Sequence, residues 1–203
     1  MSDFKDQYSA KASAEPSLSE RLVTLRAFIK SHSTVTLTTR APDGSLHSRT
    51  MAPAEITKDW LFRFVFDKDS YKETEVENDN HVNISIDGGQ GGNGWVSIAG
   101  KASVKTDDEL IKHLYNPTVK AWFGDKGDGV HDGGPTDPRI ACMQVKVDEI
   151  RHFHQERTQI GTIVDIVSSA IGGNVATPGS IRTITGEEIA AAWAKGELEE
   201  GGK

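Results

Sequence analysis

The strongest constraint on the fold is a change in the spacing of apolar residues near residue 34. Ser17-Leu-Ser-Glu20 is a capping box, and apolar residues then recur every three or four positions, at Leu18, Leu22, Leu25 and Ile29. This pattern predicts an amphipathic helix over residues 18–31. Beyond it, apolar residues alternate with polar ones, which is the period of strands with one buried face. The chain is therefore expected to build a sheet.

Six strands are predicted, over residues 34–39, 45–56, 60–66, 81–86, 95–105 and 139–153. Ala41-Pro-Asp-Gly44 has the composition of a hairpin turn between the first two. Short helices are predicted over residues 69–78, after the capping box Thr106-Asp-Asp-Glu109, and from Asn116-Pro117 to about Phe123, followed by a loop over residues 124–138. Short connections and the lack of alternating long helices favour an antiparallel six-stranded barrel with short helical insertions.

The 203 residues fit one domain with terminal extensions. We expect residues 1–16 to form a flexible arm, residues 17–155 the barrel domain and residues 156–203 a helical C-terminal extension. The extension carries an apolar stripe and a last helix that opens at Thr185-Gly-Glu-Glu188; the stripe consists of Ile160, Ile163, Val164 and Val167. Whether this stripe packs on the same barrel or on another subunit stays open at this stage.

Composition narrows the classes of function. Thirty acidic residues against 23 basic ones, a net charge of −7, argue against a nucleic-acid binder, which needs a basic surface. No stretch approaches the ~20 apolar residues that span a bilayer, and the polar N-terminus does not resemble a signal peptide. We therefore expect a cytoplasmic protein without membrane contact. Its single cysteine, Cys142, is expected in the core.

Common catalytic motifs are missing from the sequence. It has no Gly-x-Ser-x-Gly elbow, and the run from Gly94 to Lys101 misses the phosphate-loop spacing by one residue. His152 and His154 share one face of a predicted strand, but no third metal ligand is identifiable, so no metal site is predicted.

One arrangement of residues suggests anion binding. Arg49 lies on the second predicted strand, and Ser70-Tyr-Lys72 opens the helix after the third. If these strands are hairpin neighbours, Arg49 meets the N-terminus of that helix. A guanidinium, an ammonium, a hydroxyl and free backbone N–H groups together form a phosphate site.

Five segments carry a resemblance to a known family: Ser48-Arg-Thr-Met51, Asp69-Ser-Tyr-Lys72, Glu77-Asn-Asp-Asn-His-Val-Asn-Ile-Ser85, Trp95-Val-Ser-Ile-Ala-Gly100 and residues 120–139. They resemble the pyridoxamine 5′-phosphate oxidase-like FMN-binding split barrels, in particular the general stress proteins and the fungal blue-light-inducible proteins. The resemblance covers about residues 18–153.

This resemblance implies a homodimer with two FMN molecules at the subunit interface. Arg49 and Lys72 would bind the FMN phosphate, helped by Ser70 and Tyr71 at the start of the helix. The other implied cofactor contacts are Thr50 and Met51 along the isoalloxazine edge, Phe66 and Asp67 on the ribityl-phosphate side, Trp95 near the flavin, and Trp122 from the interface side.

The chain departs from the family pattern at three places. Phe66 stands where relatives commonly have Thr, Trp95 replaces an amide of the oxidases, and the C-terminal Trp and Arg-Leu-x-Pro pattern of the oxidases is absent. We therefore expect no oxidation of pyridoxamine 5′-phosphate.

Three hypotheses on function stay open. The protein is an FMN-dependent oxidoreductase or flavin reductase acting on an unidentified small molecule, or a non-catalytic flavin-binding protein of the stress or light response, or a split barrel with another ligand, such as a flavin-like cofactor or haem, or with none. No catalytic residue is predicted.

Overall fold

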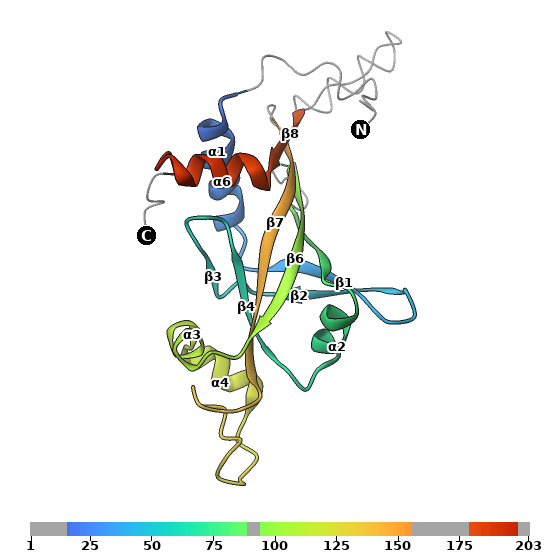
Figure 1. The fold of residues 1–203 in the computed structure, drawn as a ribbon, viewed down its shortest axis with the longest axis vertical. Coiled ribbons are helices and arrows are strands. Elements are labelled where there is room, and N and C mark those ends of the chain that lie inside the picture. Colours follow the sequence, from blue (N-terminus) through green and yellow to red (C-terminus); the bar gives the residue numbers. More distant parts are fainter. Residues whose placement is uncertain (1–15, 89–93, 156–178, 199–203) are drawn as a thin grey trace.

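The computed structural model describes residues 16–88, 94–155 and 179–198 (Figure 1). The helices are α1 (Leu18–Lys30), α2 (Tyr71–Asn78), α3 (Asp108–Leu114), α4 (Pro117–Phe123) and α6 (Gly186–Ala194). The strands are β1 (Val35–Arg40), β2 (Leu46–Met51), β3 (Glu55–Ile56), β4 (Phe62–Asp67), β5 (His81–Asp87), β6 (Gly94–Lys105), β7 (Ile140–Gln155) and β8 (Gly179–Thr185).

All eight strands belong to one antiparallel sheet with the order β2-β1-β5-β6-β7-β4-β3, and β8 pairs with β7. The 16-residue strand β7 organises it. Its first part pairs with β4, its last part pairs with β8, and β6 runs along it for most of its length. The predicted split-barrel fold is confirmed, with eight strands in place of the expected six.

The extra strands have two separate origins. The strand expected over residues 45–56 divides at Pro53, which has no N–H group for a ladder hydrogen bond. Its first part, β2, pairs with β1, whereas its second part, β3, pairs with β4. The other addition, β8, was not predicted, because residues 179–185 form a strand only through their pairing with β7.

The described part of the C-terminal extension packs on its own barrel. The Nη2 atom of Arg21 in α1 lies 3.0 Å from the Oε1 atom of Glu188 in α6, and Arg21 also donates to the Thr183 carbonyl oxygen in β8. Ile184 and Ile189 are buried beside them. In Figure 1, α1 and α6 accordingly lie together at one end of the barrel. The predicted arm up to residue 15 and the apolar stripe between residues 160 and 167 lie outside the described residues.

Helix caps confirm most of the predicted helix starts. Ser17 and Thr185 form capping boxes with Glu20 and Glu188, as expected. The start of α3 differs, because the cap is Asp107 rather than Thr106: its side chain accepts a hydrogen bond from the N–H group of Leu110 at 2.8 Å. A carboxylate is as good an N-cap as a hydroxyl, so the helix starts one residue later than predicted.

Alternating strand residues build the core. Phe62, Phe64 and Phe66 of β4 all point inward, as predicted, and pack with the apolar faces of β1, β5, β6 and α1. A second, smaller cluster lies beneath α3 and α4 and includes Cys142. Cys142 is fully buried, which raises the pKa of its thiol to about 11 and confirms its place in the core.

Gly100 marks a close approach of two strands. The register between β6 and β7 shifts between Ala99 and Gly100, and a Cβ atom on Gly100 would lie 2.4 Å from the carbonyl oxygen of Lys146. Such a bulge bends a long strand, which a barrel requires. Within the described ranges, no helix is long and apolar enough to cross a membrane.

Candidate functional site

The N-terminus of α2 begins directly after β4. Ser70 is its N-cap, and the Ser70 backbone N–H and hydroxyl both donate to the Asp67 carbonyl oxygen, at 3.1 and 2.5 Å. The Asp67 side chain accepts from the N–H group of Asp69 at 2.9 Å. Because the Ser70 side chain points back to β4, it makes no capping hydrogen bond to α2. The Ser70 carbonyl oxygen accepts from the N–H group of Glu73 at 3.2 Å, but the Ser70 side chain satisfies none of the first N–H groups of the helix.

Lys72 lies in the first turn of α2. Its side chain is half-buried, and its Nζ atom lies 5.9 Å from the centre of the Phe66 ring. Burial lowers the pKa of Lys72, and the positive charge of Arg49 lowers it further, while Asp67 and Glu75 act in the opposite direction. Lys72 and Arg49 are therefore close enough for their positive charges to interact.

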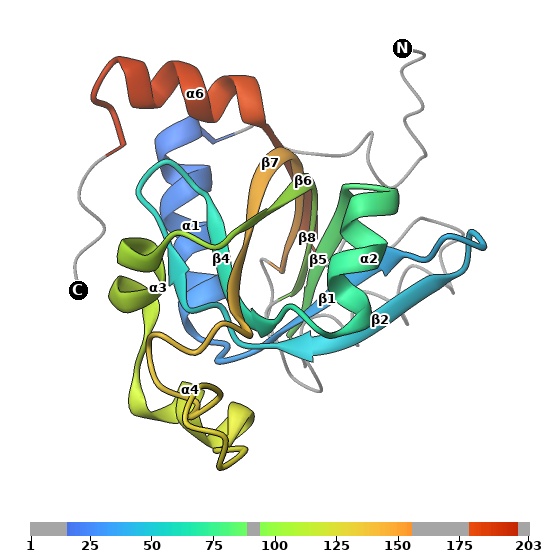
Figure 2. The ribbon, with the colours of Figure 1, turned by 60° about the horizontal axis from the view of Figure 1, so that its bottom comes forward.

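Arg49 reaches Lys72 by a different route from the predicted one. The expected hairpin holds for the end of the predicted strand, where β3 pairs with β4, but Arg49 lies on β2, which pairs with β1 instead. The connection is made by α2, which lies against β1 (Figure 2). The helix is also less exposed than its charged sequence suggested, because Glu75 and Val76 are only 3% and 6% exposed.

A buried hydrogen-bond network holds the Arg49 side chain. Its Nη2 atom donates to Oε2 of Glu75 at 2.7 Å, and its Nη1 atom donates to the Thr39 hydroxyl and, at 3.4 Å, to the Leu37 carbonyl oxygen. Thr39 in turn donates to Oε2 of Glu75, and Nδ1 of His47 donates to Oε1 at 2.6 Å. Burial by itself raises the pKa of Glu75, but these donors outweigh it and the net shift is downward. The carboxylate is therefore ionised at neutral pH.

The structure gathers half of the predicted cofactor residues at one place, namely Arg49, Phe66, Asp67, Ser70 and Lys72. We call these five residues the phosphate cluster. Thr50 is exposed and Met51 half-buried on β2, next to Arg49 in the chain. The Tyr71 side chain is 86% exposed although its backbone begins α2.

The two predicted tryptophans lie apart from the phosphate cluster. Trp95 stands at the start of β6 and stacks on Phe153 with 6.1 Å between ring centres. Trp122 in α4 is 84% exposed. Across the described residues, no hydrogen bond, ion pair or ring contact joins either tryptophan to the cluster.

The prediction missed three residues of this site: Thr39, His47 and Glu75. Two of them carried a readable signal. His47 is two positions before Arg49 on a strand, so both side chains share one face, and Glu75 follows Lys72 by three positions on a helix. Thr39 carried none, because its place beside Arg49 depends on the pairing of β1 with β2.

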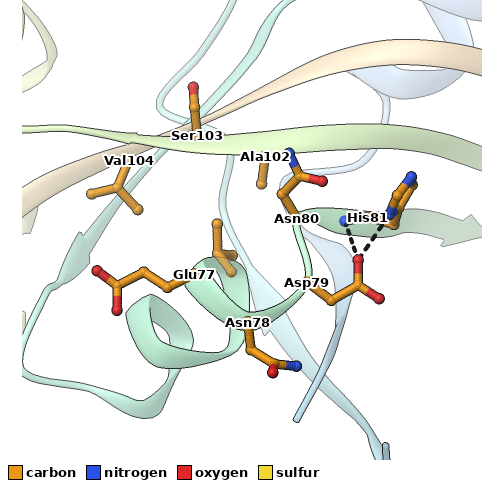
Figure 3. Close-up of a pocket in the computed structure, with 9 residues that line it drawn as sticks. Glu77, Asn78, Asp79, Asn80, His81, Ala102, Ser103 and Val104 are labelled. Atoms are coloured by element: carbon orange, nitrogen blue, oxygen red, sulfur yellow. Dashed lines mark hydrogen bonds and ion pairs between the residues drawn. The ribbon is translucent and has the colours of Figure 1, made fainter. Parts of the chain in front are cut away.

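Two surface grooves lie outside the phosphate cluster. The first, of about 420 Å³, lies between the end of α2 and β6, and Figure 3 shows Glu77 and Asn78 on one side and Ala102, Ser103 and Val104 on the other. In it, Asp79 accepts hydrogen bonds from the N–H and Nδ1 of His81. The second groove, of about 370 Å³, is lined by residues 31–36, Thr50 and residues 85–87. Neither groove holds two cations, so charge and not volume identifies the candidate anion site.

The sequence singled out two histidines on β7 as a possible pair of metal ligands. His152 and His154 lie with 5.7 Å between ring centres. Throughout the part of the chain that the structure describes, no three His, Cys, Asp or Glu side chains are arranged to hold a metal ion.

The fold and the phosphate cluster can now be compared with known proteins. The model of the pyridoxamine 5′-phosphate oxidase-like family matches residues 20–177, and the chain belongs to this family. The chain is similar to protein bli-3 of Neurospora crassa, with 36% identity over 182 residues, which cover 89% of this chain and 87% of that protein.

Solved structures share the fold. One is a protein related to general stress protein 26, from Clostridium acetobutylicum, with a TM-score of 0.61 and 10% identity, covering 84% of this chain and 98% of that one. Another is a pyridoxamine 5′-phosphate oxidase-related, FMN-binding protein from Nostoc punctiforme, with a TM-score of 0.53 and 14% identity, covering 66% of this chain and 82% of that one. At these identities the likeness concerns the fold alone.

Proposed function

We propose that the protein binds FMN, with the FMN phosphate held at the phosphate cluster. The observation that carries this proposal is that α2 brings two cations together: Arg49 binds Glu75 of this helix, and its charge acts on Lys72 in the first turn, where the Ser70 side chain makes no capping hydrogen bond. Helix N-termini with adjacent Arg and Lys side chains are suited to phosphate groups. The FMN-binding relative in the family supports the choice of FMN over other phosphates.

The residues present fit a phosphate dianion. Burial and the positive charge of Arg49 both lower the pKa of Lys72, against the opposing effect of Asp67 and Glu75, so the two cations repel each other. A phosphate would relieve this repulsion, and each charge-assisted hydrogen bond to it contributes roughly 1.5–3 kcal/mol. Tyr71 would supply its backbone N–H group at the start of the helix, whereas the N–H group and hydroxyl of Ser70, which was also expected to help, both donate to the Asp67 carbonyl oxygen.

We further propose that the protein acts as a homodimer with FMN between the subunits. Tyr71, Trp95 and Trp122 expose 86%, 38% and 84% of their surfaces in the single chain, and aromatic residues are enriched in the cores of interfaces. In such a dimer, Thr50 and Met51 would lie along the isoalloxazine edge, and the two tryptophans would contribute to the ring pocket. The barrel from residue 17 to residue 155 would then be the cofactor-binding domain.

Bound FMN would supply the redox chemistry, and the chain would supply position and charge. The protein therefore needs no catalytic acid or base of its own, and we assign none. We propose a cytoplasmic oxidoreductase or flavin reductase that acts on a small molecule other than pyridoxamine 5′-phosphate. The alternative is a flavin-binding protein of the stress or light response without turnover.

Titration of the apo-protein with FMN and with riboflavin tests the proposal. We expect tight FMN binding with a yellow complex, and weaker binding of riboflavin, which has no phosphate. Replacing Arg49→Ala and Lys72→Ala together removes at least two charge-assisted hydrogen bonds, so FMN affinity is expected to fall about 100-fold or more. The control is Lys112→Ala with Lys195→Ala, which removes two charges from α3 and from the end of α6.

Two outcomes would contradict the proposal: a wild-type spectrum that does not respond to FMN, or full FMN retention in the Arg49/Lys72 double variant. In the first case, a titration with haem tests the other-ligand alternative. If FMN binds, anaerobic mixing with NADH or NADPH separates the two remaining alternatives, because bleaching of the flavin indicates a reductase and an unchanged spectrum indicates a binding protein.

A further inference from the structure

We propose that Glu75 is a positioning residue that holds the Arg49 guanidinium in place for the FMN phosphate. This inference rests on the proposed function. Glu75 is 3% exposed and stands on the helix whose N-terminus carries Lys72, whereas Arg49 comes from a strand that does not pair with β4. The 2.7 Å contact between Nη2 of Arg49 and Oε2 of Glu75 is therefore what ties the two cations to one site.

The two oxygen atoms of Glu75 have different partners. Oε1 accepts from Nδ1 of His47 at 2.6 Å, while Oε2 accepts from Arg49 and Thr39. Because His47 and Thr39 orient the carboxylate from both sides, it can fix the direction of the guanidinium. A flexible arginine loses considerable rotamer entropy on binding a ligand, and prior fixation removes that cost from the binding step.

The hydrogen bonds of Arg49 leave room for an anion. A guanidinium has five donors, and within the described structure Arg49 uses two on Nη1 and one on Nη2. One N–H on Nε and one on Nη2 remain for an incoming acceptor. The Arg49 side chain is 24% exposed while that of Glu75 is 4% exposed, so the carboxylate lies on the inner side and the guanidinium is the part that solvent and ligand can reach.

Two electrostatic effects of Glu75 oppose each other. Its negative charge offsets that of Arg49 and so weakens the attraction for a phosphate, but the same charge keeps Arg49 next to Lys72 in spite of their repulsion. We infer that positioning dominates, because the ion pair with Glu75 joins Arg49 to α2, whereas its two neutral acceptors, Leu37 and Thr39, lie on β1.

The test compares FMN and riboflavin affinities of wild type and Glu75→Gln. The glutamine has nearly the same shape and keeps one acceptor for Arg49, but removes the charge assistance. We expect FMN affinity to fall about tenfold and riboflavin affinity to stay within about twofold. A merely structural role would weaken both flavins alike, so the ratio of the two affinities isolates positioning. The matched control is Glu77→Gln, an exposed carboxylate on the same helix that should change neither.

A double-mutant cycle closes the argument. If Glu75 acts through Arg49, Glu75→Gln should have no further effect on FMN affinity in an Arg49→Ala background. Equal tenfold losses in both backgrounds, or an FMN affinity that is unchanged or higher in Glu75→Gln, would overturn the inference while leaving FMN binding intact. Wild type that shows no preference for FMN over riboflavin would instead overturn the proposed phosphate site itself.

Discussion

Arg139 and Arg49 each pair with a carboxylate, but the two pairs are built differently. Arg139 and Asp137 are 5% and 0% exposed at their side chains, with 2.6 Å between Nη2 and Oδ2. Arg139 also donates hydrogen bonds to Oδ1 of Asp137 and to the carbonyl oxygens of Phe123 and Gly124. Asp137 also accepts from the backbone of Gly133 and Arg139. Arg49, in contrast, is 24% exposed, and a second cation, Lys72, lies nearby.

The difference between the two ion pairs indicates which one serves stability and which one serves ligand binding. The Arg139 pair is closed: its bonds tie the end of α4 and the loop from residue 124 to 138 to the start of β7, the part of the molecule that projects from the lower end in Figure 1. The Arg49 pair is open on the side of the guanidinium. A buried ion pair alone therefore does not indicate a ligand site, whereas unused guanidinium donors beside a second cation favour one.

The largest expected loss of stability follows from breaking the Arg139–Asp137 pair. Arg139→Met leaves the Asp137 carboxylate buried without its cation, which typically costs about 3–5 kcal/mol of unfolding free energy. Arg49→Met should cost about 1–2 kcal/mol, because His47 and Thr39 still bind Glu75. Urea unfolding of both apo-proteins measures the two values. Equal losses would show that the two pairs do not differ in structural weight.

A buried ionisable group whose ring nitrogens make no hydrogen bond to other described residues differs from Arg139 in the opposite direction. His152 is 1% exposed, neither of its ring nitrogens has a hydrogen-bond partner in the described structure, and burial lowers its pKa to about 4. Below its ordinary pKa of 6.5 the unfolded chain takes up a proton that the native imidazole refuses, so stability should fall as the pH drops from 6.5 towards 4. The loss is expected to be about 3 kcal/mol.

Denaturant unfolding of His152→Leu between pH 7 and pH 4 checks this pH dependence. The unfolding free energy of His152→Leu should fall less between pH 7 and pH 4 than that of wild type. His81→Leu, which removes an exposed histidine, should show the same fall as wild type. An identical pH profile in wild type and His152→Leu would assign the acid sensitivity to other groups.

The smallest expected effect on stability concerns Trp122. This residue lies on α4, the helix whose end is bound by Arg139. Because this side chain is 84% exposed, Trp122→Ala should change the unfolding free energy of the isolated chain by less than about 0.5 kcal/mol. If Trp122 lies near FMN at a dimer interface, the same variant should weaken dimerisation and FMN binding in sedimentation and titration experiments. Trp193→Ala, at an exposed tryptophan on α6, is the control, and equal effects of both would argue against an interface role for Trp122.

Features that depend on neighbouring residues could be predicted well. The capping boxes at Ser17 and Thr185 and the inward alternation of Phe62, Phe64 and Phe66 are where the sequence indicated them. The residue types of the phosphate cluster were also recognised. Features that depend on pairing failed: the division at Pro53, strand β8 and the supposed hairpin between the Arg49 strand and β4.

The sequence by itself determined most of the elements, the barrel class and the family, because caps, periods of two and short motifs act over a few residues and are visible in the chain. Only the tertiary structure decided how Arg49 reaches Lys72. Their proximity needs β1 between β2 and α2, and it needs the buried Glu75 of α2 to bind Arg49. Because strand order and side-chain burial arise from contacts between residues far apart in the chain, no local pattern could place the positive charges of the site together.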